Sequence, residues 1–349
     1  MADTYIKGTA IITPVGLHTA QTCASVRSGI MRFAQLPWKD KKYDPFVMAT
    51  LPDGCLPLID TEEKECIPFG DRGLRMLRLV GALQEELAPI VPEQEIPLVV
   101  GLAQNDKLSI EVTEGYLRQM AAVSKINIDQ SLSRLIAKGR ASGILAIIEA
   151  MKILESGSAR AVLAGGCDTY KDPELLGALD VETRLKSETN RDGFIPGEGA
   201  GLLLLTNHPP QKSQGATGYR ITATATGFEP GHIHSKAPYR GKGLSQTFKS
   251  LFKDFTQKIG TVYSTMNGES YWGKEWGVAS IRYKDHFAED HGFEHPADCY
   301  GDLGGAAGPV MTALAMGGLA NNYNKAPVLI YASSDDGERA AIIIDNVQS

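Results

Sequence analysis

Residues 142–168 read SGILAIIEAMKILESGSARAVLAGGCD. The segment 142–157 is apolar at most of its positions and too long for one strand, which is typical of a largely buried helix. Gly157 is placed to end this helix, because glycine adopts the left-handed conformation found after helix C-termini at little cost. The run ARAVLAGG (159–166) follows as a short apolar strand. A buried helix that leads directly into a buried strand predicts an α/β fold.

The same alternation extends along the whole chain and predicts mainly parallel or mixed sheets. In the first half we expect further strands at 5–14, 96–103 and 199–206, with helices at 19–29, 71–89 and near 110–123. In the second half we expect strands at 219–228, 261–268, 326–334 and 339–347, with helices at 242–260, 275–290 and 304–320. Each half closes with a buried helix followed by two strands, which indicates a weak internal duplication.

The boundary between the halves is predicted at NHPPQKSQGATG (207–218), because its proline, glycine and serine content is typical of a linker. The halves are then 1–206 and 219–349. The proline-rich segment 36–70 lacks clear periodicity, and we expect it to be an extended surface excursion.

Composition narrows the class of protein. The chain has 349 residues, of which 43% are hydrophobic and 22% charged, as in ordinary globular proteins. Its longest apolar runs are strand length, so no membrane span is expected. The N-terminus lacks a secretory signal pattern, and we expect a cytoplasmic protein. A formal charge of −6 argues against a nucleic-acid partner. The five cysteines are scattered without CxxC spacing.

Four stretches, in order along nearly the whole chain, resemble motifs of one family, the β-ketoacyl-ACP synthases of the thiolase superfamily. They are GTAIITPVGLHTAQTCASVRSG (8–29), SGILAIIEAMKILESGSARAVLAGGCD (142–168), RDGFIPGEGAGLLLL (191–205) and GDLGGAAGP (301–309). The resemblance implies the thiolase fold, in which two related βαβαβαββ halves stack in five α-β-α-β-α layers. It also implies a dimer with a second thiolase-fold chain, either a second copy or a different protein.

The same resemblance implies that the catalytic residues are replaced. Family members use a cysteine at a helix N-terminus and two histidines, and these positions hold Arg140, Asn267 and Asp302 here. The family's aromatic gate corresponds to SSDDG (333–337), which keeps only the final glycine. Because an unpaired buried arginine is costly, we expect Arg140 and Asp302 to face each other, with Asn267 or Glu269 completing the hydrogen bonds.

Other nucleophiles are candidates for the same cavity. Ser142 begins the helix and is interpreted first as its N-cap, and Cys299 is interpreted first as a packing residue. Residues that would contact a substrate are Gly305, Ser333 and Gly337.

The histidines do not indicate a metal site, and no cofactor is expected. His286, His291 and His295 lack the i, i+4 spacing of a helical metal pair. His232 and His234 could share one face of a strand, but no third ligand is evident from the sequence.

The scaffold motifs persist while the chemical positions change, which predicts a degenerate ketosynthase. We expect a non-catalytic partner, scaffold or chaperone subunit, beside an active ketosynthase or in a secretion-effector cluster, with acyl carrier protein or acyl-CoA as further candidate partners. The alternatives are an acyltransferase or thioesterase-like enzyme that uses Cys299 or Ser142, or a 3-oxoacyl-ACP synthase.

Overall fold

The computed structural model describes residues 3–59, 70–104, 114–209 and 218–347. Five strands of the first half form one sheet in the order β5-β4-β6-β7-β1. They are β1 (Thr4–Ile12), β4 (Leu98–Leu102), β5 (Arg134–Ala137), β6 (Ala161–Thr169) and β7 (Glu198–Thr206). Strand β4 pairs parallel with β5 and β6, whereas β7 is antiparallel to β6 and β1. The sheet is therefore mixed, as predicted.

The second half repeats this arrangement. Its strands follow the order β10-β9-β11-β12-β8, which matches β5-β4-β6-β7-β1 position by position. They are β8 (Gly218–Phe228), β9 (Ile259–Ser264), β10 (Phe287–Glu294), β11 (Val328–Ser333) and β12 (Glu338–Val347). Pairing of Thr4–Ile6 in β1 with residues 219–221 of β8 joins the two sheets into ten strands. The repeated strand order confirms the predicted duplication.

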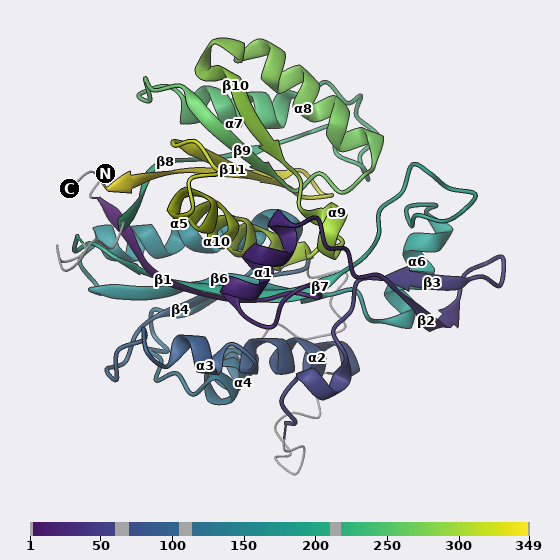
Figure 1. Cartoon of the computed structure of the whole chain (residues 1–349), viewed down its shortest axis with the longest axis horizontal. Helices are drawn as coiled ribbons and strands as arrows, with labels where there is room; N and C mark the ends of the chain where they lie inside the picture. The colour runs from purple at the N-terminus through teal and green to yellow at the C-terminus, as the bar shows by residue number, and fades with distance from the viewer. Residues whose placement is uncertain (1–2, 60–69, 105–113, 210–217, 348–349) are drawn as a thin grey trace.

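Helices complete five layers (Figure 1). Helices α5 (Ser142–Glu155) and α10 (Ala307–Ala320) lie between the two sheets. The outer face of the first sheet is covered by α2 (Gly70–Gly81), α3 (Gln84–Leu87) and α4 (Glu114–Ser124), and that of the second by α7 (Lys242–Leu251) and α8 (Ser270–Arg282). The predicted α-β-α-β-α arrangement is confirmed.

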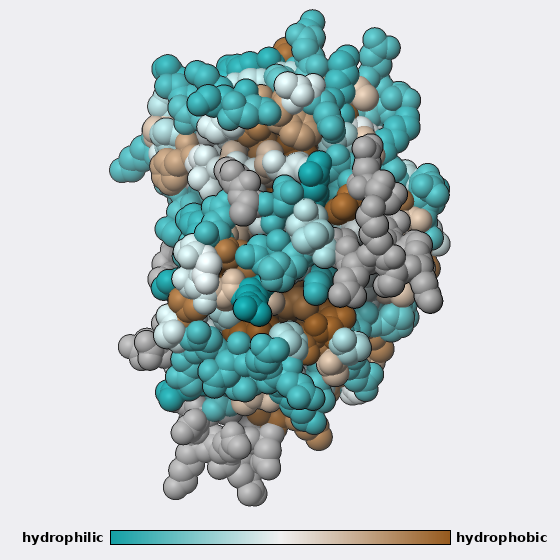
Figure 2. All heavy atoms as spheres, turned by 90° about the vertical axis from the view of Figure 1, so that its left-hand side faces the viewer, coloured by the Kyte–Doolittle hydropathy of each residue, from teal (hydrophilic) through white to brown (hydrophobic). Residues whose placement is uncertain are grey.

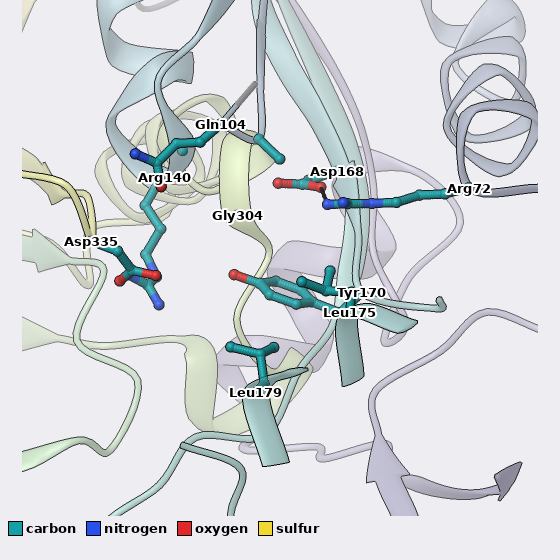
Figure 3. A pocket seen from close by; sticks show the side chains of 11 residues that line it. Arg72, Gln104, Arg140, Asp168, Tyr170, Leu175, Leu179, Gly304 and Asp335 are labelled. Atoms are coloured by element: carbon teal, nitrogen blue, oxygen red, sulfur yellow. Dashed lines mark hydrogen bonds and ion pairs between the residues drawn. The ribbon is translucent and has the colours of Figure 1, made fainter. Parts of the chain in front are cut away.

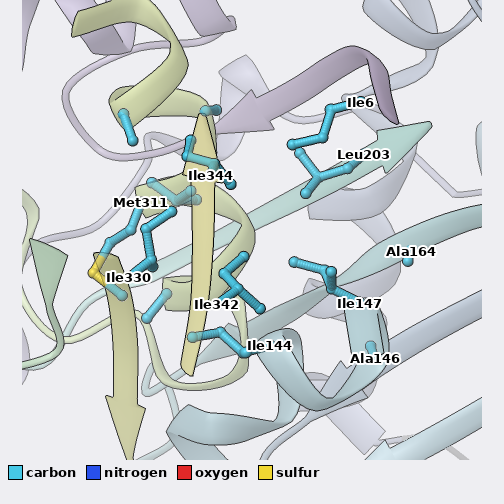
Figure 4. Close-up of a cluster of buried hydrophobic side chains, with 14 of the residues drawn as sticks. Ile6, Ile144, Ala146, Ile147, Ala164, Leu203, Met311, Ile330, Ile342 and Ile344 are labelled. Carbon is cyan, nitrogen blue, oxygen red and sulfur yellow. The ribbon is translucent and has the colours of Figure 1, made fainter. Parts of the chain in front are cut away.

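The central helices pack on both sheets through small and aliphatic side chains. A Cβ at Gly143 would lie 2.5 Å from the Gly305 carbonyl oxygen and from Pro309 Cδ, so only glycine allows α5 to approach the start of α10 this closely. Around this contact the buried cluster of Figure 4 joins α5, α10 and strands of both sheets, through Ile144, Ile147, Leu203, Met311, Ile330, Ile342 and Ile344.

The remaining elements lie at the edges. Helix α1 (Thr19–Arg27) follows β1, α6 (Pro173–Val181) follows β6, and α9 (Ala297–Tyr300) precedes the glycine-rich loop. A separate hairpin consists of β2 (Ala34–Lys39) and β3 (Pro45–Met48). Short 3-10 turns occur at Asp53–Cys55, Gly139–Ala141, Lys284–His286 and Gly304–Ala306. Figure 2 shows the face on which both chain ends lie, where hydrophobic residues gather within a largely hydrophilic surface.

Several sequence expectations were wrong in detail. The helix expected at 275–290 ends at Arg282, and 287–294 is the edge strand β10, in which Phe287 is buried. The segment 36–70 is not only a surface excursion, because Phe46 and Met48 of β3 are buried in a local apolar cluster. Strand β5 and helix α6 were not predicted. Of the expected linker, residues 210–217 lie outside the described residues, and Gly218 already begins β8.

Candidate functional site

The head of helix α5 is formed by the tight turn Gly139–Ala141. Gly139 has φ +69°, a conformation that glycine adopts without strain, and the turn carries Arg140 inward to 3% exposure. The hydroxyl of Ser334 accepts a 2.9 Å hydrogen bond from the Ala141 N–H and donates to the Lys138 carbonyl. The loop between β11 and β12 therefore fixes the start of α5 through hydrogen bonds on both sides of Arg140.

Arg140 forms ion pairs with two carboxylates, that of the buried Asp302 and that of the partly buried Asp335. Its Nε donates to Asp302 Oδ2, and its Nη1 lies 2.5 Å from Asp335 Oδ1. Asn267 Nδ2 donates to Asp302 Oδ2 at 2.8 Å and to Glu269 Oε2 at 3.2 Å. The predicted pairing of Arg140 with Asp302, completed by Asn267, is confirmed. The sequence reasoning missed Asp335.

A second arginine, also missed, ties the same carboxylates together. Arg184 donates two 2.8 Å hydrogen bonds to Glu269 and a 2.7 Å bond to Asp335 Oδ2. Two guanidinium groups and three carboxylates thus form one continuous network, with Arg140 Nη2 at 3.9 Å from Glu269. Bidentate arginine–carboxylate geometry is among the strongest polar contacts in proteins.

Aromatic rings flank the guanidinium group of Arg140 in this network. The Arg140 guanidinium carbon lies 5.1 Å from the Trp272 ring centre and 5.6 Å from that of Phe194. Burial alone would lower the pKa of the Arg140 guanidinium, but the neighbouring Asp302 and Asp335 carboxylates outweigh it and hold that pKa well above its ordinary value. Arg140 is therefore a permanent cation.

The space beside Arg140 is small. The pocket there has a volume of about 30 Å³, enough for roughly one or two water molecules and far below the several hundred Å³ of ordinary ligand pockets. Figure 3 shows Arg140 and Asp335 on one side and Asp168 with Arg72 on the other, with Tyr170 between them. A second space beside Asp302, lined also by Tyr300 and Met311, measures about 10 Å³. Among the described residues, neither space is large enough for an acyl chain.

The glycine-rich loop 301–309 is held by a separate ion pair. Asp168 Oδ1 lies 3.0 Å from Arg72 Nη2, and its Oδ2 accepts a 3.0 Å bond from the Gly305 N–H. Burial raises the pKa of the Asp168 carboxyl, although Arg72 opposes the shift. A Cβ at Gly304, whose φ is +51°, would lie 2.0 Å from Asp168 Oδ2, so this close approach requires glycine.

The two alternative nucleophiles lie in packed surroundings. Ser142 is the first residue of α5 and makes no capping bond, so its interpretation as the N-cap was wrong. Its Oγ is fully buried and has no hydrogen-bond partner. Cys299 is 7% exposed within the central apolar cluster, where burial raises the pKa of its thiol. Neither residue lines the pocket beside Arg140.

The three residues proposed to contact a substrate have intramolecular partners. Gly305 donates to Asp168, as described, and Ser333 Oγ donates to Glu275 Oε2 at 2.6 Å. Gly337 has φ +106° in the turn of the β11–β12 hairpin, and its carbonyl accepts a 2.8 Å bond from the Glu229 N–H. All three positions support the loops around Arg140.

Five of the seven histidines, those considered as possible metal ligands, form two groups. His286 stacks on Phe252, His291 Nδ1 bonds to the Ala288 carbonyl, and His295 Nδ1 lies 3.0 Å from Asp298. The other two, His232 and His234, lie in the loop after β8, beside Asp336. The third candidate ligand is therefore the Asp336 carboxylate. It lies 102 residues after His234 in the chain, so the sequence did not reveal it.

Solved structures with a similar architecture include several ketosynthases. A ketosynthase in complex with its chain length factor from Xenorhabdus doucetiae gives a TM-score of 0.78 at 16% identity, covering 99% of this chain and 98% of that one. The ketosynthase from module 6 of the bacillaene synthase of Bacillus subtilis gives 0.79 at 15% identity, with 99% and 72% covered. The ishigamide ketosynthase/chain length factor gives 0.74 at 15% identity, with 99% and 100% covered.

Sequence comparison finds shorter similarities. The family profile of the β-ketoacyl synthase N-terminal domain matches residues 139–210, which include Arg140. The 3-oxoacyl-[acyl-carrier-protein] synthase 2 of Staphylococcus aureus is 30% identical over 126 residues, 33% of this chain and 31% of that protein. The match thus spans about a third of this relative's length. Polyketide synthase PksN of Bacillus subtilis is 41% identical over 71 residues, 18% of this chain and 1% of that protein.

The fold places the chain in the class of proteins with the ketosynthase architecture. Within that class, the segment that carries Arg140 is similar in sequence to the N-terminal domain of β-ketoacyl synthases. Among the described residues, no helix combines the length and the hydrophobicity needed to span a membrane.

Proposed function

We propose that the chain is a ketosynthase-like pseudoenzyme that acts by binding, as a partner, scaffold or chaperone subunit. The observation that carries this proposal is Arg140 at the head of α5, buried and paired with Asp302 and Asp335 beside a pocket of about 30 Å³. A guanidinium stays protonated and cannot attack a thioester. Asp302 and Asp335 fix the Arg140 guanidinium in the position where we propose that an active ketosynthase would carry its acyl group.

The two other positions that correspond to catalytic residues support the same proposal. Asn267 donates its amide hydrogens to Asp302 and Glu269, so its side chain stabilises the ion-pair network. Asp302 Oδ1 accepts a 2.8 Å bond from the Gly304 N–H and its Oδ2 accepts from Arg140. Neither side chain supplies the neutral imidazole that a general acid–base role at these positions would use.

The alternative enzymes receive less support from the geometry. An acyltransferase or thioesterase that uses Ser142 needs a base within hydrogen-bond reach of Oγ, and that atom has no partner. One that uses Cys299 needs a stabilised thiolate, whereas burial raises this thiol's pKa. Plain 3-oxoacyl-ACP synthase activity would need a nucleophile at the head of α5, where Arg140 lies.

The partner we propose is a second thiolase-fold chain, either another copy or an active ketosynthase, with acyl carrier protein or acyl-CoA as further candidates. Structural neighbours described as a ketosynthase with its chain length factor support a partner of this class. The function also fits a cytoplasmic biosynthetic setting.

A condensation assay tests the proposed function. The purified chain is incubated with acyl-ACP and malonyl-ACP, alone and mixed with a ketosynthase encoded in the same gene neighbourhood. We expect no 3-oxoacyl-ACP from the chain alone, and co-elution of the two proteins in gel filtration. Condensation by the chain alone, at a rate that the Cys299→Ser or Ser142→Ala variant abolishes, would instead establish an enzyme.

A further inference from the structure

The two loops beside the β8–β12 pair bring together two imidazoles and a carboxylate. His232 and His234 come from the loop after β8, and Asp336 comes from the turn between β11 and β12. One candidate ligand atom from each residue lies within 4.8 Å of the other two. His234 Nδ1 and Asp336 Oδ1 are 2.5 Å apart.

The loops that carry these groups are fixed by their surroundings. The pairing of Phe228 with Glu338 in the β8–β12 ladder sets the two loops side by side. The Glu229 N–H then donates to the Gly337 carbonyl at 2.8 Å, across the gap between them. The buried Glu229 carboxylate accepts from the N–H groups of Gly231 and Gly243, which anchors the start of the histidine loop. A cluster held this way needs little rearrangement to bind a ligand.

The polar atoms of the cluster are incompletely satisfied. His232 Nδ1 is buried and has no hydrogen-bond partner. His234 Nε2 lies 3.8 Å from the Glu182 carboxylate, on the far side of its ring from Asp336. Carboxylates in this position orient metal-ligating imidazoles and increase their basicity.

We propose that His232, His234 and Asp336 bind a divalent transition-metal ion, with Zn²⁺ as the probe. Two imidazoles and one carboxylate are a ligand set that zinc accepts, with one or more positions left for water. Bonds of about 2.0–2.1 Å place tetrahedral ligand atoms about 3.3 Å apart. His234 Nδ1 and Asp336 Oδ1 would move apart by about 1 Å to reach this spacing. The distances from these two atoms to the His232 ring nitrogen would shorten by up to about 1.5 Å.

The surroundings favour a cation. The pocket of about 580 Å³ next to the cluster is lined by the carboxylates of Glu182 and Asp192, and by Glu269, whose charge is paired with Arg184. Arg184 lines it too, but both of its donor edges are paired with Glu269 and Asp335. Asp336 directly follows Asp335, which holds Arg140, so a bound ion would also fix the loop that closes the pocket beside α5. This inference does not depend on the proposed function.

Metal titration of the full chain, expressed without a polyhistidine tag, tests the site. Zn²⁺ is titrated in competition with a chromophoric chelator, and Co²⁺ is titrated with the visible spectrum recorded. We expect one ion per chain, with no thiolate charge-transfer band in the Co²⁺ spectrum. His234→Ala and Asp336→Asn should each weaken binding by at least about tenfold. Circular dichroism in EDTA verifies that each variant is folded.

The matched control is His295→Ala, because His295 also contacts a carboxylate, Asp298, but lies outside the cluster. It should bind Zn²⁺ as the wild type does. Absence of stoichiometric binding by the wild type would overturn the proposal. Equal binding by the His234→Ala and Asp336→Asn variants would overturn it as well, by placing the metal elsewhere.

Discussion

Arg140 is a large, permanently charged side chain with only 3% of its surface exposed. Taking such a group out of water costs several kcal/mol, and its paired carboxylates offset that cost. A buried pair of this kind is weak evidence for added stability but strong evidence for a fixed arrangement, because removal of one partner leaves the other charge buried and unpaired.

Asp302→Asn tests this balance. The change removes one of the two carboxylate charges paired with Arg140 while keeping the size of the side chain, and we expect it to lower the free energy of unfolding by about 3 kcal/mol. Urea denaturation provides the measurement. The double variant Arg140→Met/Asp302→Asn should lose less free energy of unfolding than the single variant, since both charges of this pair are then removed.

Glu149→Gln is the control for this series, since it breaks the exposed pair with Lys152 and should cost about 0–1 kcal/mol. A cost for Asp302→Asn as small as that of the control would mean that Arg140 does not depend on its partner.

The sequence was sufficient to predict the Arg140–Asp302 pair, because the resemblance implied that these opposite charges face each other and a buried arginine needs a partner. It was not sufficient to predict Asp335 or Arg184. The gate segment SSDDG was interpreted as a loss of aromatic rings, when its two aspartates also add charge next to Arg140. Arg184 precedes the recognised motif 191–205, and only the fold brings it to Glu269.

At the scale of elements, the β11–β12 hairpin serves as a cap for helix α5. Ser334 is fully buried, and its hydroxyl is the partner of the Ala141 N–H at the helix start. Ser334→Ala should therefore cost about 1–3 kcal/mol, since it leaves a buried donor unpaired. The measurement is the urea concentration at the midpoint of unfolding, which reports stability as long as the slope of the transition is the same in variant and wild type.

Ser156→Ala is the matched control at the other end of the same helix, where the hydroxyl donates to the Ile153 carbonyl near solvent. Its cost should be clearly smaller. Equal effects of the two variants would show that the hairpin does not cap α5.

Glu198 links strand β7 to helix α2 and gives stability a defined dependence on pH. Its buried carboxylate accepts from Arg75 Nε at 2.8 Å and from the Leu51 N–H at 2.7 Å. Burial would raise the pKa of Glu198, but the hydrogen bonds from Arg75 outweigh it and hold that pKa below its ordinary value. This stabilisation is complete above the unfolded pKa of about 4.3 and is lost as the pH falls through the folded value.

Glu198→Gln should thus lower the free energy of unfolding by about 3 kcal/mol at pH 7. The difference from the wild type should narrow as the pH falls from 5 towards 3, because the wild-type carboxylate then becomes protonated as well. Unfolding curves at a series of pH values measure this difference. A gap that stays constant over the whole range would contradict the account.

Most elements followed from hydrophobic periodicity, and the failures have physical causes. Residues 287–294 are polar at half their positions because β10 is an edge strand, so the pattern resembled the end of an exposed helix. Strand β5 was missed because it has only four residues, and its order in the sheet depends on pairing with β4. Helix α7 begins after Gly241, which has φ +60° and no side chain to cap the helix. The usual serine or aspartate signal for a helix start is therefore absent there.

At the scale of the whole molecule, the site lies between the two halves and is built from residues more than 160 positions apart in the sequence. Arg140 comes from the first half, and Asp302 and Asp335 come from the second. The head of α5, the glycine-rich loop and the β11–β12 hairpin meet there. The ion-pair network lies at this meeting point.

Intact mass spectrometry after incubation with acyl-CoA or acyl-ACP tests the central claim most directly. An active ketosynthase with its cysteine intact, treated in parallel, should gain the mass of the acyl group. We predict that the wild-type chain keeps its unmodified mass of 37.6 kDa, because Arg140 lies at the head of α5 and neither Cys299 nor Ser142 lines the pocket beside it. A stable acyl adduct mapped to Cys299 or Ser142 would contradict the account.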